Sequence, residues 1–198
     1  MSSPQILRMA ICLVPFTTSL DFIGPMDVLG LLVQQNIDGL NQAGILPQKL
    51  DPAARIEPTY LSISKDPVVV SAGPPVRADK TYDEEGLGQY DIIFVPGGEC
   101  TALGGAWRKR LLRSEALVYL EPGPPIPLAP SMDKFLKEQA PGAKYIMSVC
   151  TGSFSLGQAG LLDGKRATTN KATYKLCIVC RCVSHPEPTR LLIIWYFG

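Results

Sequence analysis

One short segment limits the fold more than any other: residues 144–149 (KYIMSV) form a mainly apolar run that leads directly into Cys150, Thr151 and Gly152. Such a run is typical of a strand that is buried on both faces of a parallel sheet. Apolar residues at helical spacing follow, and the small residues two positions on either side of Cys150 suit the sharp strand-to-helix turn of a nucleophile elbow. The segment therefore predicts a strand and a helix with a cysteine at the turn between them.

Two further apolar runs predict strands of the same sheet. Residues 9–14 (MAICLV) and 90–95 (YDIIFV) are each stopped by a proline. The other expected elements are a helix over about 24–35, a long surface connection over 36–52, strands at 60–64 and 68–70 that form a hairpin beside the main sheet, and a short helix over 132–139. Because strands alternate with helices, we expect parallel βαβ units and hence an α/β three-layer sandwich with ligands at the carboxyl ends of its strands.

The composition excludes several classes of function. The 198 residues include 19 Lys plus Arg and 18 Asp plus Glu, so there is no surplus of positive charge for a nucleic-acid backbone. The longest apolar run, 191–197 (LLIIWYF), is far shorter than the roughly 20 residues of a membrane-spanning helix. Residues 1–16 have too short an apolar stretch for a secretory signal. We therefore expect a cytoplasmic protein with neither a nucleic-acid nor a membrane partner.

In a reducing compartment, the six cysteines are expected to be structural, catalytic or metal-binding rather than paired in disulfides. Cys150 is the candidate nucleophile because a helix N-terminus behind the turn stabilises a thiolate through its dipole. The alternative is a buried structural cysteine, which is common for this residue type.

Two other places carry candidate site residues. Glycines after the strand at 90–95 allow backbone N–H groups to approach a ligand, so the N–H groups of Gly98 and Thr151 are predicted to form an oxyanion hole. The alternative is a flexible exit from the strand. Asp21 lies among apolar neighbours beyond the first strand. It is either a buried catalytic acid or a cap for the following helix.

Three blocks together resemble the ThiJ/PfpI superfamily, also called the DJ-one superfamily, and in particular its isonitrile hydratase branch. These blocks are residues 16–30 (FTTSLDFIGPMDVLG), 90–98 (YDIIFVPGG) and 135–170, which contains SVCTGSFSLGQAGLLDG. The resemblance covers residues 9–175 except for 104–130. It implies a family domain over 1–175 with an insertion at about 104–130, and a tail over 176–198 that lacks family character.

The resemblance also implies a flavodoxin-like fold with a mainly parallel sheet, of the class I glutamine amidotransferase type, and a homodimer. It implies Cys150 as nucleophile, Asp21 as the acid that hydrogen-bonds it, and Thr151 beside it. The expected reaction converts a small-molecule isonitrile to an N-substituted formamide, without metal or cofactor. A neutral Asp21 next to a thiolate is the form that a proton donor needs.

The chain departs from the family where many relatives carry a histidine, because Asn170 ends the run Ala167-Thr168-Thr169-Asn170. The missing histidine argues against protease or amidotransferase chemistry and weakens a glyoxalase-like reaction, which is the enzymatic alternative. A non-enzymatic cysteine redox sensor is a further alternative.

The tail over 176–198 is typical of a translated intron or a shifted reading frame, so an inactive truncated product is the remaining alternative. Without the closing elements of the family, a sheet edge and an apolar face are expected to be bare. The tail contains Cys177, Cys180, Cys182 and His185. Cys180 and Cys182 are too close together to serve easily in one zinc tetrahedron, so no metal site is expected.

Overall fold

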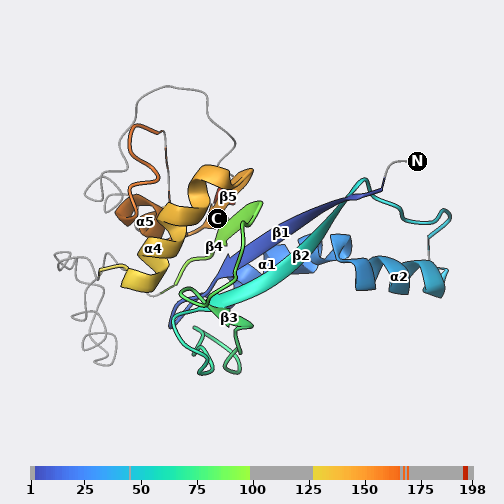
Figure 1. Ribbon diagram of the computed structural model, residues 1–198. Coiled ribbons are helices and arrows are strands. Elements are labelled where there is room, and N and C mark those ends of the chain that lie inside the picture. Colours follow the sequence, from blue (N-terminus) through green and yellow to red (C-terminus); the bar gives the residue numbers. More distant parts are fainter. Residues whose placement is uncertain are drawn as a thin grey trace.

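A parallel sheet organises the chain in the computed structural model, which describes residues 3–44, 46–98, 127–165, 167, 169 and 194–195 (Figure 1). The strands are β1 (Gln5–Cys12), β2 (Ala54–Ser62), β3 (Lys80–Thr81), β4 (Ile92–Val95), β5 (Tyr145–Val149) and β6 (Ile194–Trp195). Their order in the sheet is β3-β2-β1-β4-β5-β6, and every pair of neighbours runs parallel. The predicted parallel sheet is confirmed.

Helices cover both faces of the sheet. They are α1 (Ser19–Leu29), the short 3-10 helix η1 (Gly30–Leu32), α2 (Gln34–Ala43), α4 (Pro130–Gln139), the 3-10 helix η2 (Ala140–Gly142) and α5 (Gly152–Gln158). Alternation along β1 explains the two layers, because successive side chains of a strand point to opposite faces. Ala10 and Cys12 belong to the core cluster that contains residues of α4 and α5, whereas Met9 and Ile11 pack with Phe22 of α1.

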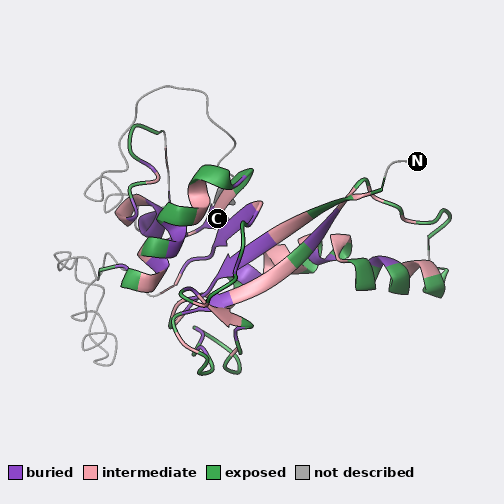
Figure 2. Cartoon of the chain, in the orientation of Figure 1, coloured by how far each residue is buried: buried purple, intermediate pink, exposed green. Residues whose placement is uncertain are grey.

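The core therefore lies on both sides of the central strands, and Figure 2 shows the buried residues gathered on β1, β4 and the helices beside them. All four residues of β4 are buried, which accounts for its uninterrupted apolar sequence. This arrangement is the predicted α/β three-layer sandwich.

The order of the strands reverses between β1 and β4. From β1 the chain moves outward to β2 and β3, and then returns to the other side of β1 to form β4 and β5. In open α/β sheets, ligands bind at such a switch point, outside the carboxyl ends of the strands. The loops that follow β1, β4 and β5 are therefore the segments that define the candidate site.

Several predicted boundaries were wrong. α1 begins at Ser19 rather than near Gly24, so Pro25 lies inside the helix. The segment 36–52 was expected to be a connection, yet α2 occupies it as far as Ala43. The sequence of α2 has a weak apolar pattern, because among its residues it is Ile37 that is buried against the rest of the fold. The chain leaves this helix at Gly44, whose φ of 62° is the left-handed conformation typical of a helix end.

The predicted hairpin of strands 60–64 and 68–70 is not formed. Val68 instead makes an isolated antiparallel bridge to Val76, on the other side of the Gly-Pro-Pro sequence. The strand β2 begins at Ala54 and pairs with β1 in the main sheet instead of standing beside it.

Some predictions fall on parts of the chain outside the described residues. These are residues 104–126 of the predicted insertion, Asn170, and the potential metal-binding side chains of the tail, Cys177, Cys180, Cys182 and His185. In the tail, the two residues of β6 pair with Ser148 and Val149, so this part of the expected bare edge of β5 is covered.

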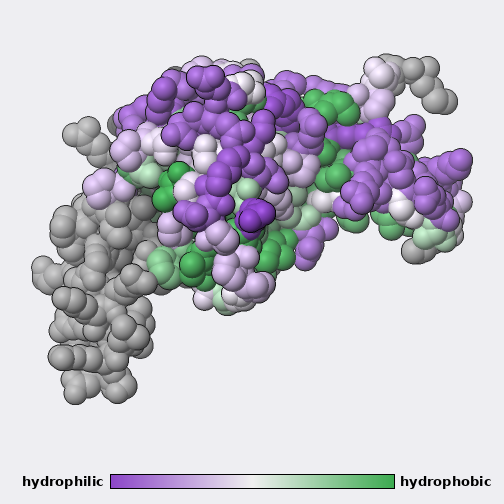
Figure 3. Space-filling view, turned by 60° about the horizontal axis from the view of Figure 1, so that its bottom comes forward, coloured by the Kyte–Doolittle hydropathy of each residue, from purple (hydrophilic) through white to green (hydrophobic). Residues whose placement is uncertain are grey.

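Among the described residues, no helix is both long enough and apolar enough to cross a bilayer. Figure 3 shows one face of the molecule, on which hydrophilic residues predominate and apolar residues form separate patches.

Candidate active site

Cys150 lies at a strained turn between β5 and α5. Its φ of 55° is in the left-handed region, which residues with a side chain rarely adopt. Such a conformation costs of order 1–3 kcal/mol and is concentrated at functional sites. The small residue Ser148 is buried before the turn, and Cys150 itself is only partly buried. The structure thus has the geometry of the predicted elbow, with Cys150 only partly buried at its turn.

Gly152 allows α5 to start close to β4. A Cβ atom at this position would lie 2.1 Å from the backbone oxygen of Val95 and 3.0 Å from that of Pro96. Real Cβ atoms do not approach backbone atoms this closely, so any larger residue has to move the start of α5 or the end of β4. The glycine of the elbow is therefore required by backbone packing.

We expect Gly152→Ala to lower the free energy of unfolding by about 2–3 kcal/mol, because overpacking against backbone atoms forces the elbow to shift. Chemical denaturation followed by circular dichroism measures this change. Gly39→Ala is the matched control, since a Cβ at Gly39 of α2 meets nothing within 4 Å. That variant is expected to be as stable as the wild type or more stable, by up to about 1 kcal/mol. Equal effects of the two substitutions would contradict the packing argument.

Gly97, in the loop after β4, lies where Asp21 and Cys150 come together. A Cβ on Gly97 would be 2.4 Å from Oδ2 of Asp21, 2.8 Å from Cβ of Cys150 and 3.1 Å from the backbone nitrogen of Thr151. Three elements thus converge at one point: the first turn of α1, the loop after β4 and the elbow. The absence of a side chain at Gly97 leaves room for this approach.

The Asp21 carboxyl group interacts with Cys150 directly. Burial raises the pKa of Asp21 above the usual range for aspartate, while hydrogen bonds to the Cys150 side chain and the Gly97 backbone oppose this increase. Its Oδ2 atom is buried and has no hydrogen-bond partner among the described residues. An oxygen of this kind disfavours the charged form, so the environment shifts Asp21 toward its neutral form.

The interpretation of Asp21 as a helix cap was wrong. The residue at the cap position of α1 is Thr18, and Asp21 lies within the first helical turn. The Thr18 N–H donates to the Gly97 carbonyl over 2.8 Å, which fixes the start of α1 to the loop after β4. This tertiary contact explains why the helix begins earlier than Pro25.

The predicted oxyanion hole differs from the structure in one of its two donors. The Gly98 N–H donates to the hydroxyl oxygen of Thr151 over 3.1 Å, and the same hydroxyl lies 3.2 Å from the Gly98 carbonyl. Gly98 therefore holds the Thr151 side chain instead of presenting its N–H to a ligand. The Thr151 N–H remains as the candidate donor, next to Gly97 and Cys150.

Two residues of the loop after β1 were missed by sequence reasoning. Phe16 has a φ of 60°, and it and Cys150 are the non-glycine residues with a positive φ among those described. Thr17 is fully buried, and its hydroxyl accepts from the Val14 N–H over 2.9 Å and donates to the Val14 carbonyl. The Phe-Thr-Thr sequence was visible, but nothing in its composition indicates a strained loop.

Cys12 provides a contrast with Cys150. It is fully buried in β1, and burial raises the pKa of its thiol far above the usual range. Its neighbour Tyr82 donates a hydrogen bond to the Leu13 carbonyl over 2.8 Å. Cys12 is therefore the structural cysteine of the pair, and it serves as an internal control for the reactivity of Cys150.

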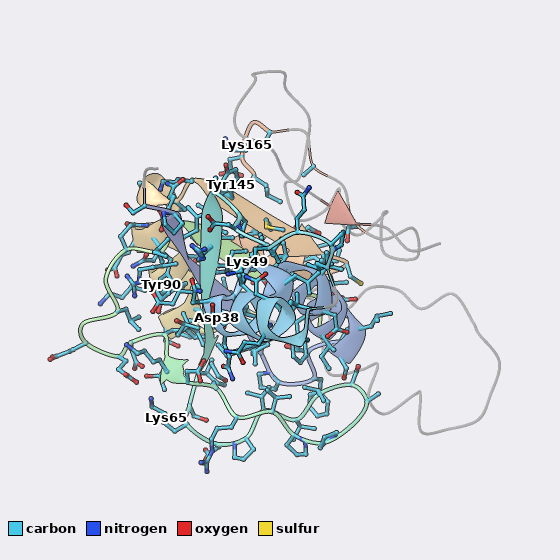
Figure 4. The ribbon with its side chains drawn as sticks, turned by 90° about the vertical axis from the view of Figure 1, so that its right-hand side faces the viewer. Asp38, Lys49, Lys65, Tyr90, Tyr145 and Lys165 are labelled. Carbon is cyan, nitrogen blue, oxygen red and sulfur yellow. The ribbon has the colours of Figure 1, made fainter. Side chains whose placement is uncertain are left out.

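Outside this site, the described residues offer little chemistry. They contain no group of three His, Cys, Asp or Glu side chains that could hold a metal ion. A shallow polar hollow on α2 and the following loop is lined by Asp38, Asn41, Gln42 and Lys49, two of which are labelled in Figure 4. It lies at the opposite end of the molecule from α5 (Figure 1).

Comparison with known proteins gives two relatives by sequence. The chain is 31% identical over 170 residues to isonitrile hydratase of Pseudomonas putida, which covers 86% of this chain and 55% of that protein. It is 35% identical over 112 residues to a protein of Streptomyces lividans described only as uncharacterized, covering 57% of this chain and 62% of that one. The chain thus spans less than two thirds of the length of these relatives. No family model matches the chain.

Solved structures share the fold. A ThiJ/PfpI family protein from Pseudomonas syringae superposes with a TM-score of 0.63 at 21% identity, over 96% of this chain and 62% of that protein. The DJ-1beta protein of Drosophila melanogaster superposes with a TM-score of 0.60 at 17% identity, over 97% of this chain and 81% of that protein. These likenesses confirm the predicted flavodoxin-like α/β sandwich.

Proposed function

We propose that this chain, which belongs to the ThiJ/PfpI superfamily and is a homologue of isonitrile hydratase, hydrates a small electrophile such as an isonitrile. In this proposal Cys150 is the nucleophile and Asp21 is the proton donor. The product is an N-substituted formamide. The proposal assigns the activity of the longer isonitrile hydratase to the part of the fold that this chain contains.

One observation carries the proposal: a partly buried cysteine and a carboxyl group whose pKa is raised by burial meet at the carboxyl ends of the strands. A nucleophile must not be sealed in the core, and Cys150 at the elbow is only partly buried, unlike Cys12. A general acid needs a pKa above that of an ordinary carboxyl group, which burial provides at Asp21. Both requirements of an addition to an electrophilic carbon are met by adjacent side chains.

The first proposed step forms a bond between the Cys150 sulfur and the terminal carbon of the isonitrile. The Asp21 carboxyl group gives its proton to the same carbon, so that an enzyme-bound thioimidate and an Asp21 carboxylate result. Water then adds to this carbon, the carbon–sulfur bond breaks, and the thiolate leaves. Of the two protons of the water molecule, one stays on the formamide nitrogen and the other returns to Asp21, so the cycle closes without an oxidant or a reductant.

The decisive assay compares two electrophiles. We expect the purified chain to convert an alkyl isonitrile (isocyanide) to the N-alkyl formamide, which is detected by its formyl proton in NMR spectra. The rate with methylglyoxal is expected to be at least about tenfold lower, because no histidine base is found among the described site residues. Consumption of methylglyoxal alone would instead favour the glyoxalase-like reaction. Failure to consume either compound, in a chain that is folded by circular dichroism, would contradict the proposed function.

A further inference from the structure

Two buried hydroxyl groups converge on the backbone carbonyl of Cys150. The Thr169 hydroxyl donates to this oxygen over 2.9 Å, and the Ser153 hydroxyl donates to it over 3.2 Å. Ser153 is fully buried and Thr169 is 5% exposed. The mechanism proposed above uses neither residue. A carbonyl that accepts two hydrogen bonds from buried side chains has its direction fixed.

The direction of this carbonyl determines where the next N–H points. In a trans peptide unit the C=O and N–H groups are coplanar and point in opposite directions. The two hydroxyls hold the oxygen side of the Cys150–Thr151 peptide. The backbone nitrogen of Thr151, on the other side of this peptide, lies 3.1 Å from the position that a Cβ atom on Gly97 would occupy. Asp21 Oδ2 and Cys150 Cβ lie close to that same position. Holding the carbonyl of Cys150 thus presents the Thr151 N–H to the site.

The orientation of this peptide depends on the contacts that hold it, because Cys150 is in a strained conformation. A left-handed φ of 55° is unfavourable for cysteine and persists only where surrounding contacts impose it. The Gly98 N–H is already bonded to the Thr151 hydroxyl, so the Thr151 N–H is the donor on which charge stabilisation at this site depends. Loss of the hydroxyls that hold the peptide would therefore affect the chemistry as well as the stability.

We propose that Thr169, assisted by Ser153, is a positioning residue that orients the Cys150–Thr151 peptide so that the Thr151 N–H faces the reacting group. The inference rests on the proposed function of Cys150 as a nucleophile. Ser153 lies three residues after Cys150, at the start of α5, where a serine hydroxyl commonly bonds to the preceding turn. Thr169 is 19 residues away in sequence, so its hydrogen bond is the long-range contact that links the segment after α5 to the elbow.

The test compares Thr169→Val, which keeps the shape of the side chain but removes the hydroxyl, with Thr169→Ser, which keeps the hydroxyl. We expect Thr169→Val to lower kcat for isocyanide hydration about tenfold to a hundredfold while KM changes less than about twofold, because a misdirected donor affects the transition state more than binding. Thr169→Ser is expected to retain kcat within about threefold of the wild type.

A second readout does not depend on turnover. Alkylation of Cys150 by iodoacetamide is measured against pH by mass spectrometry, with the fully buried Cys12 as the unreactive control. A backbone N–H beside a thiolate stabilises it. The pH of half-maximal alkylation is therefore expected to be higher in Thr169→Val than in the wild type and to return in Thr169→Ser. A residue that only supports the fold would not shift this midpoint in folded protein.

The outcomes separate the two proposals. If the wild type does not hydrate isocyanides but the alkylation midpoint shifts and is restored as described, the proposed function fails and the positioning role stands. Identical alkylation profiles of the wild type and Thr169→Val would overturn the positioning role, as would a shift that the serine variant does not restore. If Thr169→Val does not fold, Ser153→Ala takes its place, and an unchanged midpoint in that variant overturns the inference.

Discussion

Replacing Cys150 by alanine is expected to lower the rate of isocyanide hydration by at least about a thousandfold, because the step that forms the carbon–sulfur bond has no substitute nucleophile. Asp21 remains in place in this variant, so any residual rate measures what the acid and the backbone contribute without the thiol. The fold is expected to be retained, since Cys150 is only partly buried and alanine carries the same Cβ atom, which adds no backbone strain beyond that of cysteine. Steady-state assays and circular dichroism on the same preparation measure both quantities.

Two controls sharpen this result. Cys150→Ser keeps the size and hydrogen-bonding capacity of the side chain, but its hydroxyl is not ionised near neutral pH, so it is expected to be as inactive as the alanine variant. Cys12→Ala removes the other described cysteine, which is fully buried in β1. It is expected to lose stability through a cavity and to retain turnover while folded. Substantial turnover in Cys150→Ala would show that the reaction does not pass through this sulfur.

The elbow was predictable because neighbouring residues determine it. The apolar run over 144–149, the cysteine and Gly152 are contiguous, and the packing of Gly152 against Val95 is the reason why this position requires a glycine. The buried strands were predictable for a related reason. A strand that is covered on both faces has an uninterrupted apolar sequence, as all of β4 does.

The start of α1 was not predictable from local pattern. Pro25 suits the first position of a helix, and the periodic apolar residues follow it, so the sequence favours a start near Gly24. The contact that overrides this preference joins Thr18 to Gly97, which lies in a distant part of the chain. Because α1 starts before Asp21, the carboxyl group sits on the first turn of the helix, where it reaches Cys150.

The donors of the site were predicted only in part for the same reason. The Gly98 N–H was expected to be available, but its partner is a threonine hydroxyl 53 positions away in sequence. The role of Thr169 depends on a contact across 19 positions, which the local sequence around this threonine does not indicate. Residue types indicated which groups take part in the site, and only the fold shows which of them are already bonded to one another.

Replacing Asp21 by asparagine is expected to lower turnover by about a hundredfold to ten-thousandfold, the range that a general acid contributes. Asparagine keeps the size of the side chain but has no acidic proton to give to the isocyanide carbon. If Asp21 only held the thiol in position by hydrogen bonding, the asparagine variant would keep most of its activity. A loss of less than about tenfold would therefore contradict the proposed role of Asp21 as proton donor.

Although Asp21→Asn is expected to lower turnover, it is expected to raise the stability of the fold at neutral pH, because the pKa of Asp21 is raised in the folded state. A carboxyl group that holds its proton more tightly in the folded state than in the unfolded state contributes stability fully below the pKa of the unfolded state, and this contribution is lost as the pH rises through the folded pKa. Asparagine does not titrate, so Asp21→Asn should unfold at a higher temperature than the wild type at neutral pH. The difference should shrink as the pH falls toward the ordinary pKa of aspartate. Thermal unfolding of both proteins across this pH range tests the argument, because a difference that stays constant with pH would mean that burial of Asp21 does not disfavour its charged form.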